Sequence, residues 1–300
     1  MITISTTQIA AYKYIYRGIT NGIRRGDLNK IINQDCIAGI KELEDESVDI
    51  VVTSPPYNLN ISYGAYDDNL TQESYLEWIG ELFIQIYRVL KHNGHLWMNV
   101  GYSNINPYIG NDVLNVARKV FTLQNNIIWV KSISIDDDRS YGHYKPINSN
   151  RFANPTWENL YHFTKRGDVP CDKLAIGVPY VHKPNLKEGQ ADVRCRGNVW
   201  YIPYETICNR ESDRGNHPAT YPVELVDKCI KFSGIKEGIL VDPFMGSGTS
   251  AIGAIDNDLD YIGYDIDAGY IQYANDRINR HRLGLRRSNV EPTVFSNLFR

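Results

Sequence analysis

The side chains best placed to do chemistry lie first in a short turn, Ser54-Pro55-Pro56-Tyr57. The run before it, residues 48–53, has the near-continuous apolar character of a strand that is buried on both faces. Two prolines cannot continue a sheet, because proline has no amide hydrogen and its ring fixes the backbone. The strand must therefore end here, and it leaves a hydroxyl group and a phenol ring together at its edge.

A second informative segment covers residues 239–254, where an apolar strand, a small-residue turn and a helix follow one another. Gly246 and Gly248 remove side chains where the backbone turns tightly or approaches a ligand. The helix that begins near Thr249 offers amide groups that suit an anion. Asp265 ends the next strand, where a carboxylate can accept hydrogen bonds from a ribose diol. The third glycine of GxGxxG is absent, which disfavours a pyrophosphate; a nucleoside that carries a carboxylate fits, and so does a plain strand-to-helix turn.

Alternating strands and helices must position these two segments. Apolar runs predict strands at 30–35, 47–53, 95–101, 125–131, 157–165, 238–244 and 260–267. Apolar residues at helical spacing predict helices at 36–45, 71–91 (ended by Asn93-Gly94), about 111–120, 221–233, from about 249, and 269–282. This order predicts an α/β fold with a mostly parallel sheet. Residues 166–216 have no clear period, and we expect an irregular insert there.

Composition narrows the class of protein. The 300 residues, 42% of them apolar, suffice for one large domain or two modest ones. No segment is apolar enough to span a membrane and the chain opens without a signal-like segment, so we expect a cytoplasmic protein with no membrane contact. Five scattered cysteines without a CxxC pair argue against disulfides and zinc, and we predict no metal. Basic residues near both ends of a chain with net charge -3 permit contact with a polyanion.

Together the two segments resemble the amino-group DNA methyltransferases that use S-adenosylmethionine. TSPPY (53–57) comes before DPFMGSGT (242–249) in the chain, an order that matches the permuted β group of this family. NQDC (33–36) and NHPATYPVEL (216–225) also fall where the family has related segments. The resemblance covers about residues 28–282 and implies a Rossmann-like fold with circularly permuted motif order.

The resemblance also implies a role for each motif residue in methyl transfer to an exocyclic amine of a base flipped out of double-stranded DNA. The Ser54 hydroxyl and the Pro55 carbonyl, held by the Pro55-Pro56 step, would accept hydrogen bonds from the amine, and Tyr57 would stack on the base. Asp265 would hold the ribose of S-adenosylmethionine and Asp35 its adenine. The whole expected cofactor set is Asp35, Cys36, His217, Pro218, Asp242, Pro243, Phe244, Gly246, Ser247, Gly248, Thr249 and Asp265.

Ser54 carries the clue to the base. Adenine N6 and cytosine N4 both present an amine beside a ring nitrogen, and a serine hydroxyl can accept from one and donate to the other. Physical chemistry does not choose between them. In the family, SPPY is typical of cytosine-N4 enzymes, whereas DPPY and NPPY dominate among adenine-N6 enzymes. We therefore expect a cytosine-N4 enzyme, with adenine-N6 as the first alternative. Methylation of RNA or of a protein amide, and a non-catalytic nucleotide-binding module, are less favoured.

Sequence readout is expected from loops rich in arginine and lysine, 132–156 and 166–216. The candidate DNA contacts are Arg139, Lys145, Arg151, Lys183, Arg194, Arg196, Arg210 and Arg214. The predicted organisation is an extension (1–27), a catalytic domain (28–165 and 217–282), a target-recognition region (166–216) and a basic tail (283–300). We expect a monomer or homodimer of a restriction-modification system, whose restriction endonuclease need not contact this chain.

Overall fold

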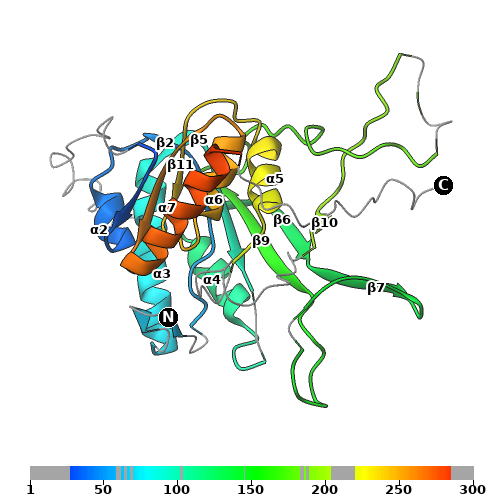
Figure 1. Ribbon diagram of the computed structural model, residues 1–300, viewed down its shortest axis with the longest axis horizontal. Coiled ribbons are helices and arrows are strands. Elements are labelled where there is room, and N and C mark those ends of the chain that lie inside the picture. Colours follow the sequence, from blue (N-terminus) through cyan, green and yellow to red (C-terminus); the bar gives the residue numbers. More distant parts are fainter. Residues whose placement is uncertain are drawn as a thin grey trace.

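An eight-stranded mixed sheet forms the centre of the protein in the computed structural model (Figure 1). The strand order is β1-β12-β11-β2-β5-β9-β6-β10, and neighbours are parallel except where β9 pairs with β5 and β6. The predicted α/β fold with a mostly parallel sheet is confirmed. The strands of the sheet are β1 (Lys30–Asn33), β2 (Val48–Thr53), β5 (Leu90–Val100), β6 (Thr122–Val130), β9 (Trp157–Thr164), β10 (Val199–Tyr201), β11 (Ile239–Asp242) and β12 (Asp260–Asp265).

The structure describes most of the chain between the two ends. The described residues are 28–58, 62–63, 66–67, 70–101, 104–144, 146–182, 186, 189–203 and 220–284. The predicted N-terminal extension, and the basic tail from residue 285 onward, lie outside these ranges. Within them, no helix has the length and apolar character needed to cross a membrane.

Helices cover both faces of the sheet, which explains the apolar run in β2. Residues of α2, α3 and α4 share one core cluster, and residues of α5, α6 and α7 share the other. Along β2, Val48 and Val51 join the first cluster, whereas Ile50 and Val52 join the second. Both faces of the strand are therefore buried, as its composition predicts. The helices are α2 (Cys36–Lys41), α3 (Gln72–Val89), α4 (Ile109–Ala117), α5 (Val223–Ser233), α6 (Thr249–Asp256) and α7 (Ala268–Arg282).

Helix α3 begins where the sequence predicts and ends earlier. Thr71 is its N-cap, and the Thr71 side chain accepts a hydrogen bond from the first turn. The helix was expected to run on to the Asn93-Gly94 pair. Instead Leu90 is already extended, is fully buried, and pairs with Val48 as the first residue of β5. Asn93-Gly94 lies inside β5, where the pairing register shifts, so burial of Leu90 decides the boundary.

Short strands account for the other departures from the sequence predictions. A hairpin of β7 (Ser132–Asp136) and β8 (Arg139–Gly142) projects from the body of the molecule, in a segment expected to be a loop (Figure 1). Strand β10 extends the sheet beside β6 in the region expected to be irregular, with Trp200 fully buried. A second ribbon joins β3 (Ser62–Tyr63) to β4 (Tyr66–Asp67). Strands this short give too few residues for a hydrophobic period.

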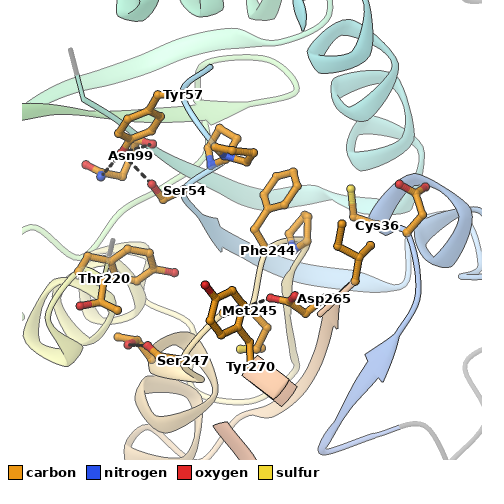
Figure 2. A pocket seen from close by; sticks show the side chains of 18 of the residues that line it. Cys36, Ser54, Tyr57, Asn99, Thr220, Phe244, Met245, Ser247, Asp265 and Tyr270 are labelled. Atoms are coloured by element: carbon orange, nitrogen blue, oxygen red, sulfur yellow. Dashed lines mark hydrogen bonds between the residues drawn. The ribbon is translucent and has the colours of Figure 1, made fainter. Parts of the chain in front are cut away.

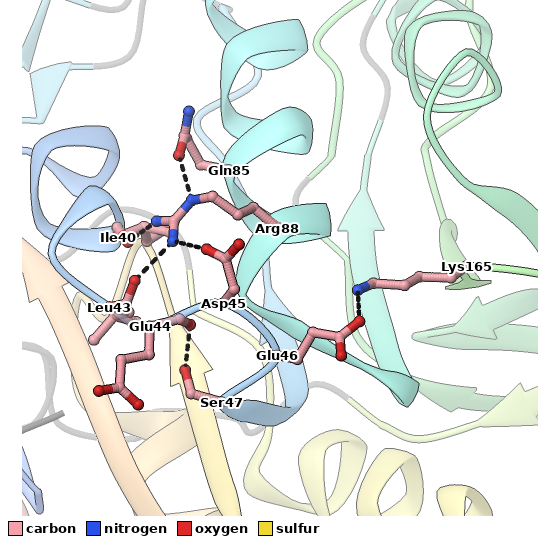
Figure 3. A network of polar contacts seen from close by, with 9 residues as sticks. All are labelled: Ile40, Leu43, Glu44, Asp45, Glu46, Ser47, Gln85, Arg88 and Lys165. Carbon is pink, nitrogen blue, oxygen red and sulfur yellow. Dashed lines mark hydrogen bonds and ion pairs between the residues drawn. The ribbon is translucent and has the colours of Figure 1, made fainter. Parts of the chain in front are cut away.

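Arg88 of α3 anchors the end of α2 through its guanidinium group (Figure 3). Its Nη1 and Nη2 atoms donate to the carbonyls of Leu43 and Ile40, each at 2.8 Å. Nη1 also pairs with the Asp45 carboxylate at 2.7 Å. The Ile40 carbonyl also accepts from the Leu43 amide at 3.1 Å, so the arginine adds a second donor there and supplies one to the Leu43 carbonyl beyond the end of the helix. The contact fixes α2, and with it the pocket residues at the start of α2, against α3.

Candidate active site

A pocket lies at the carboxyl ends of β1, β2, β11 and β12, the edge at which open α/β sheets bind ligands. Its empty space is about 1150 Å³ when the open mouth and the solvent in it are included. Both sequence segments contribute to its wall. The predicted site residues that line it are Asp35, Cys36, Ser54, Pro55, Pro56, Tyr57, Pro243, Phe244, Gly246, Ser247, Thr249 and Asp265.

Two glycines shape the turn after β11. Gly246 (φ 49°) and Gly248 (φ 80°) both adopt left-handed backbone, which strains any other residue. Gly248 is the N-cap of α6, so this helix begins at the pocket wall beside Ser247 and Thr249. Arg277 of α7 donates to the Ser247 carbonyl (3.0 Å) and to Thr249 Oγ1 (2.8 Å). In the sequence this arginine is one of several basic residues near the end of the chain, whereas in the structure it fixes the glycine turn.

Asp265 ends β12 in the pocket wall. Its Oδ2 accepts a hydrogen bond from the Gly246 amide and its Oδ1 accepts one from the Asp267 amide, both at 2.9 Å. Burial raises the pKa of this carboxyl, and the two amides act in the opposite direction. The carboxylate is thus fixed between two turns. A carboxylate has about four lone-pair sites, so it can still accept hydrogen bonds from a ligand.

The Asp35-Cys36 end of the pocket combines polar with apolar side chains. Asp35 is the N-cap of α2 and accepts a hydrogen bond from the Ala38 amide at 2.9 Å. Burial, and then the neighbouring Asp35, raise the pKa of the Cys36 thiol, which therefore stays protonated and is no nucleophile. Ile266 and Tyr270 also line the pocket, together with Phe244 (Figure 2). Apolar and aromatic side chains of this kind suit the flat faces of a heterocycle, and sequence reasoning did not single out Ile266 or Tyr270.

Asp242 lies beneath the pocket and is not part of its lining. The side chain is fully buried, and its oxygens accept hydrogen bonds from the Thr53 hydroxyl (2.7 Å), the Ser250 hydroxyl (2.5 Å), the Tyr221 hydroxyl (3.0 Å) and the Phe244 amide (3.0 Å). Burial raises the pKa of Asp242, and these donors oppose the shift. This geometry favours a positioning role for Asp242 over the expected cofactor contact, because the side chain joins β2, β11, α6 and the Tyr221 ring.

The Ser54–Tyr57 turn is held from two sides. Tyr75 of α3 donates from its hydroxyl to the Pro56 carbonyl at 2.8 Å. On the other side, Ser54 Oγ lies 2.8 Å from the Tyr57 oxygen. Gly101 leaves room for the Tyr57 ring, because a Cβ atom there would lie 2.8 Å from a ring carbon. Ser54 and Tyr57 therefore face the pocket in a defined geometry, across from Asp265 and Ser247 (Figure 2).

Two polar side chains beside the turn were missed by sequence reasoning. Asn99 of β5 donates from Nδ2 to the Tyr57 oxygen (2.9 Å) and to Glu158 Oε2 (2.6 Å). Glu158 of β9 also accepts from Lys131 Nζ at 2.8 Å. Both Asn99 and Glu158 line the pocket, as does Trp129. The sequence does show Asn99 near the end of one apolar strand and Glu158 near the start of another. Only the antiparallel pairing of β5 and β9 brings these two side chains together.

The arginines expected to bind DNA do not line the pocket. Arg139 is exposed and pairs with Asp136 across the β7–β8 hairpin. Arg151 is exposed with its guanidinium 5.1 Å from the centre of the Phe152 ring. Arg194 is exposed, and Arg196 donates to a main-chain carbonyl at 3.0 Å. The remaining predicted residues lie outside the described residues: Lys145, Lys183, Arg210, Arg214, His217 and Pro218.

Two histidines and a cysteine come together in the core, although the sequence predicts no metal. Ligand atoms of His95, His162 and Cys171 all lie within 4.8 Å of one another. His95 Nδ1 and His162 Nε2 share a hydrogen bond at 2.9 Å, and Asn125 Nδ2 lies 2.9 Å from the other nitrogen of His162. Burial lowers the pKa of His95 to about 4 and that of His162 well below its usual value. The pair is therefore a neutral, hydrogen-bonded core contact.

The amino-acid sequence is similar to those of known DNA methyltransferases. The family model for DNA methylases matches residues 48–276. The Type II methyltransferase M.HpaI of Haemophilus parainfluenzae is 30% identical over 255 residues, which cover 83% of this chain and 74% of that protein. The DNA adenine methyltransferase YhdJ of Escherichia coli (strain K12) is 27% identical over 265 residues, covering 87% of this chain and 82% of that protein.

Solved structures agree on the fold. The PvuII DNA methyltransferase (cytosine-N4-specific) matches with a TM-score of 0.63 at 18% identity, over 91% of this chain and 89% of that one. A DNA modification methylase of Thermus thermophilus, in a complex with S-adenosyl-L-methionine, matches with a TM-score of 0.57 at 21% identity, over 84% and 93%. These likenesses establish the fold alone. The match to the family model and the similarity to M.HpaI establish that the chain belongs to the N6/N4 DNA methylase family, whose members are amino-group DNA methyltransferases.

Proposed function

We propose that the protein transfers a methyl group from S-adenosylmethionine to the exocyclic amine of a base that has been flipped out of double-stranded DNA. One observation carries the proposal: a single pocket brings the Ser54–Tyr57 turn and the Gly246–Thr249 turn together at the ends of neighbouring strands. A methyl donor and an acceptor base must meet in such a pocket. The circularly permuted order of the two segments is part of the same proposal.

The residues at one end of the pocket fit S-adenosylmethionine, which supplies an electrophilic methyl group on a sulfonium when bound. Asp265 would accept hydrogen bonds from the ribose hydroxyls, since its carboxylate faces the pocket. Ile266 and Tyr270 would enclose the adenine ring. Ser247 and Thr249, at the start of α6, would bind the carboxylate of the methionine part, where helix amides and the helix dipole favour an anion.

The other end fits a flipped base. An exocyclic amine is a poor nucleophile because its lone pair is delocalised into the ring. Acceptors aimed at its two N–H bonds favour the pyramidal geometry needed for attack, and Ser54 Oγ and the Pro55 carbonyl would be those acceptors. Tyr57 would stack on the base for about 1–3 kcal/mol, which offsets part of the few kcal/mol needed for flipping.

For the base, cytosine N4 is the first candidate, because the SPPY form of the turn is typical of cytosine-N4 enzymes. Adenine N6 is the second, and the similarity to YhdJ, an adenine methyltransferase, favours it. Similarity to the Type II methyltransferase M.HpaI supports a place in a restriction-modification system. The proposed sites of sequence readout are residues 132–156 and 166–216. The first of these contains the β7–β8 hairpin, which follows directly on β6, and Trp129 of β6 lines the pocket.

Two variants separate the ends of the site. Tyr57→Ala should slow methyl transfer to duplex DNA by at least about tenfold, the equivalent of 1.4 kcal/mol of lost stacking, and leave the dissociation constant for S-adenosylmethionine within about threefold of wild type. Asp265→Ala should weaken cofactor binding instead. Isothermal titration with cofactor and a tritium-transfer assay with DNA measure both quantities. Equal loss of cofactor affinity in the two variants would contradict the assigned roles.

A further inference from the structure

A chain of hydrogen bonds leads from Lys131 to the hydroxyl of Ser54. Lys131 Nζ donates to Glu158 Oε1 at 2.8 Å, and Glu158 Oε2 lies 3.2 Å from the Tyr57 oxygen. The Tyr57 oxygen lies in turn 2.8 Å from Ser54 Oγ. The Lys131 and Glu158 side chains are only 13% and 15% exposed, so water does little to screen their contact. The group that meets the acceptor base is thus connected to a shielded ion pair.

Asn99 fixes the orientation of this network. Its Nδ2 atom donates to both the Tyr57 oxygen and Glu158 Oε2, while its Oδ1 is buried and, among the described residues, has no hydrogen-bond partner. Turning the amide over would bring its oxygen within 2.6 Å of a carboxylate oxygen, a repulsive contact. The amide hydrogens must therefore point at Tyr57 and Glu158.

The directions in which the Tyr57 and Ser54 hydroxyls donate follow from a count of the hydrogens and lone pairs at the Tyr57 oxygen. The Tyr57 oxygen has one hydrogen and two lone pairs, and Asn99 uses one lone pair. Two further oxygens face the Tyr57 oxygen, Glu158 Oε2 at 3.2 Å and the main-chain carbonyl oxygen of Asn99 at 3.4 Å, and both can only accept a hydrogen bond. If Tyr57 donated to Ser54, these acceptors would face a lone pair without a hydrogen between them. Tyr57 therefore donates toward Glu158, and the Ser54 hydroxyl donates to Tyr57.

We propose that Glu158 is a positioning residue that, through Tyr57, turns the Ser54 hydroxyl into a dedicated acceptor for the exocyclic amine of the substrate base. The inference rests on the proposed function. The hydrogen of Ser54 is committed to Tyr57, so its lone pairs are directed to the amine. Serine then does what an aspartate would do at this position, which is to accept only. Its hydroxyl is not available to donate to the ring nitrogen of the base, so discrimination between cytosine and adenine falls to other groups in the pocket.

The charge of Glu158 is what sets this polarity. Lys131, Asn99 and Tyr57 all donate to its carboxylate, so each oxygen faces hydrogen atoms. Glu158→Gln keeps the size of the side chain but removes the charge, and its amide can present a hydrogen to Tyr57. Tyr57 could then donate to Ser54, whose own hydrogen would turn toward the amine and oppose its binding.

A double-mutant cycle tests the proposal with the full-length protein. The single-turnover rate of methyl transfer to duplex DNA is measured with saturating cofactor in wild type, Glu158→Gln, Ser54→Ala and the double variant. We expect Glu158→Gln to slow transfer about 10- to 100-fold when Ser54 is present, and by no more than about threefold when residue 54 is alanine. Cofactor affinity should stay within about threefold. Glu77→Gln, an exposed charge change on α3, is the matched control and should keep the wild-type rate.

The outcomes separate the competing accounts. A merely structural role for Glu158 would slow both backgrounds by the same factor, and this additivity would overturn the proposal. If Glu158→Gln does not fold, Tyr57→Phe replaces it, since this variant keeps the ring and removes the hydroxyl that links Glu158 to Ser54. The same dependence on Ser54 supports the proposal, and a wild-type rate overturns it. A wild-type protein that methylates no DNA overturns the proposed function and this inference together, whereas an active wild type with additive losses overturns the inference alone.

Discussion

Asp242→Asn tests whether Asp242 organises the active site from beneath rather than binding the cofactor. Oδ1 of Asp242 accepts from the Thr53 hydroxyl and the Phe244 amide, and Oδ2 accepts from the Ser250 and Tyr221 hydroxyls. In the asparagine variant, the oxygen must take the place of Oδ1, because the amide hydrogen of Phe244 cannot be reversed. The new amide nitrogen then faces two hydroxyl groups, which can rotate and accept from it.

The magnitudes follow from these four contacts. Hydrogen bonds to charged groups contribute about 1.5–3 kcal/mol each and neutral ones about 0.5–1.5 kcal/mol. Asparagine keeps the contacts in neutral form, and a buried amide costs less desolvation than a buried carboxylate. We therefore expect the free energy of unfolding to fall by about 1–2 kcal/mol. Asp242→Ala leaves the same buried donors without their acceptor, and we expect it to lose about 4 kcal/mol.

Urea unfolding followed by tryptophan fluorescence measures these losses, and isothermal titration measures cofactor affinity. Because Asp242 does not line the pocket, the asparagine variant should bind S-adenosylmethionine within about threefold of wild type. A tenfold or greater loss of affinity, without a change in unfolding free energy, would show direct contact with the cofactor and refute the reasoning. An alanine variant that loses less than about 1 kcal/mol would refute it too.

Three further outcomes are expected. Arg88→Met removes the guanidinium donor from the Leu43 and Ile40 carbonyls, of which Ile40 keeps the Leu43 amide as a donor. Urea unfolding should therefore show a loss of about 1–3 kcal/mol, whereas exposed Arg118→Met should stay within about 0.5 kcal/mol; equal losses would contradict this. The pKa of His95 is about 4 in the folded protein and about 6.5 in the unfolded chain, so stability should fall as the pH drops from 7 toward 4. The difference between urea midpoints at pH 7.5 and 5 should shrink in His95→Gln, and an unchanged difference would oppose this origin. Gly101→Ala would place a methyl group 2.8 Å from a Tyr57 ring carbon, so methyl transfer should slow at least about tenfold at constant cofactor affinity, and a wild-type rate would exclude this packing.

Much of the fold was predictable because it rests on local patterns. The apolar run of β2 reports burial on two faces, and the helical period of α3 reports one. Both chemical segments follow such strands, so their meeting at one sheet edge was predictable as well. The end of α3 was not, because burial of Leu90 decides it and the local signal of Asn93-Gly94 points elsewhere.

The missed site residues share a different physical reason. Glu158 and Asn99 lie far apart in sequence and meet only because β9 runs antiparallel to β5. Arg277 looked like one of several basic residues near the end of the chain, and only the packing of α7 on the glycine turn gives it a contact. The burial of Asp242 beneath the pocket likewise depends on tertiary packing, which the motif containing it does not encode.

The central claim is tested most directly by the identity of the methylated nucleoside. The protein is incubated with S-adenosylmethionine labelled in its methyl group and with mixed-sequence duplex DNA, which is then digested to nucleosides and separated. We predict that the label appears in N4-methylcytosine. Label in N6-methyladenine would contradict the choice of base while keeping amino-group transfer. Label in 5-methylcytosine, or none in DNA, would contradict the proposed activity itself.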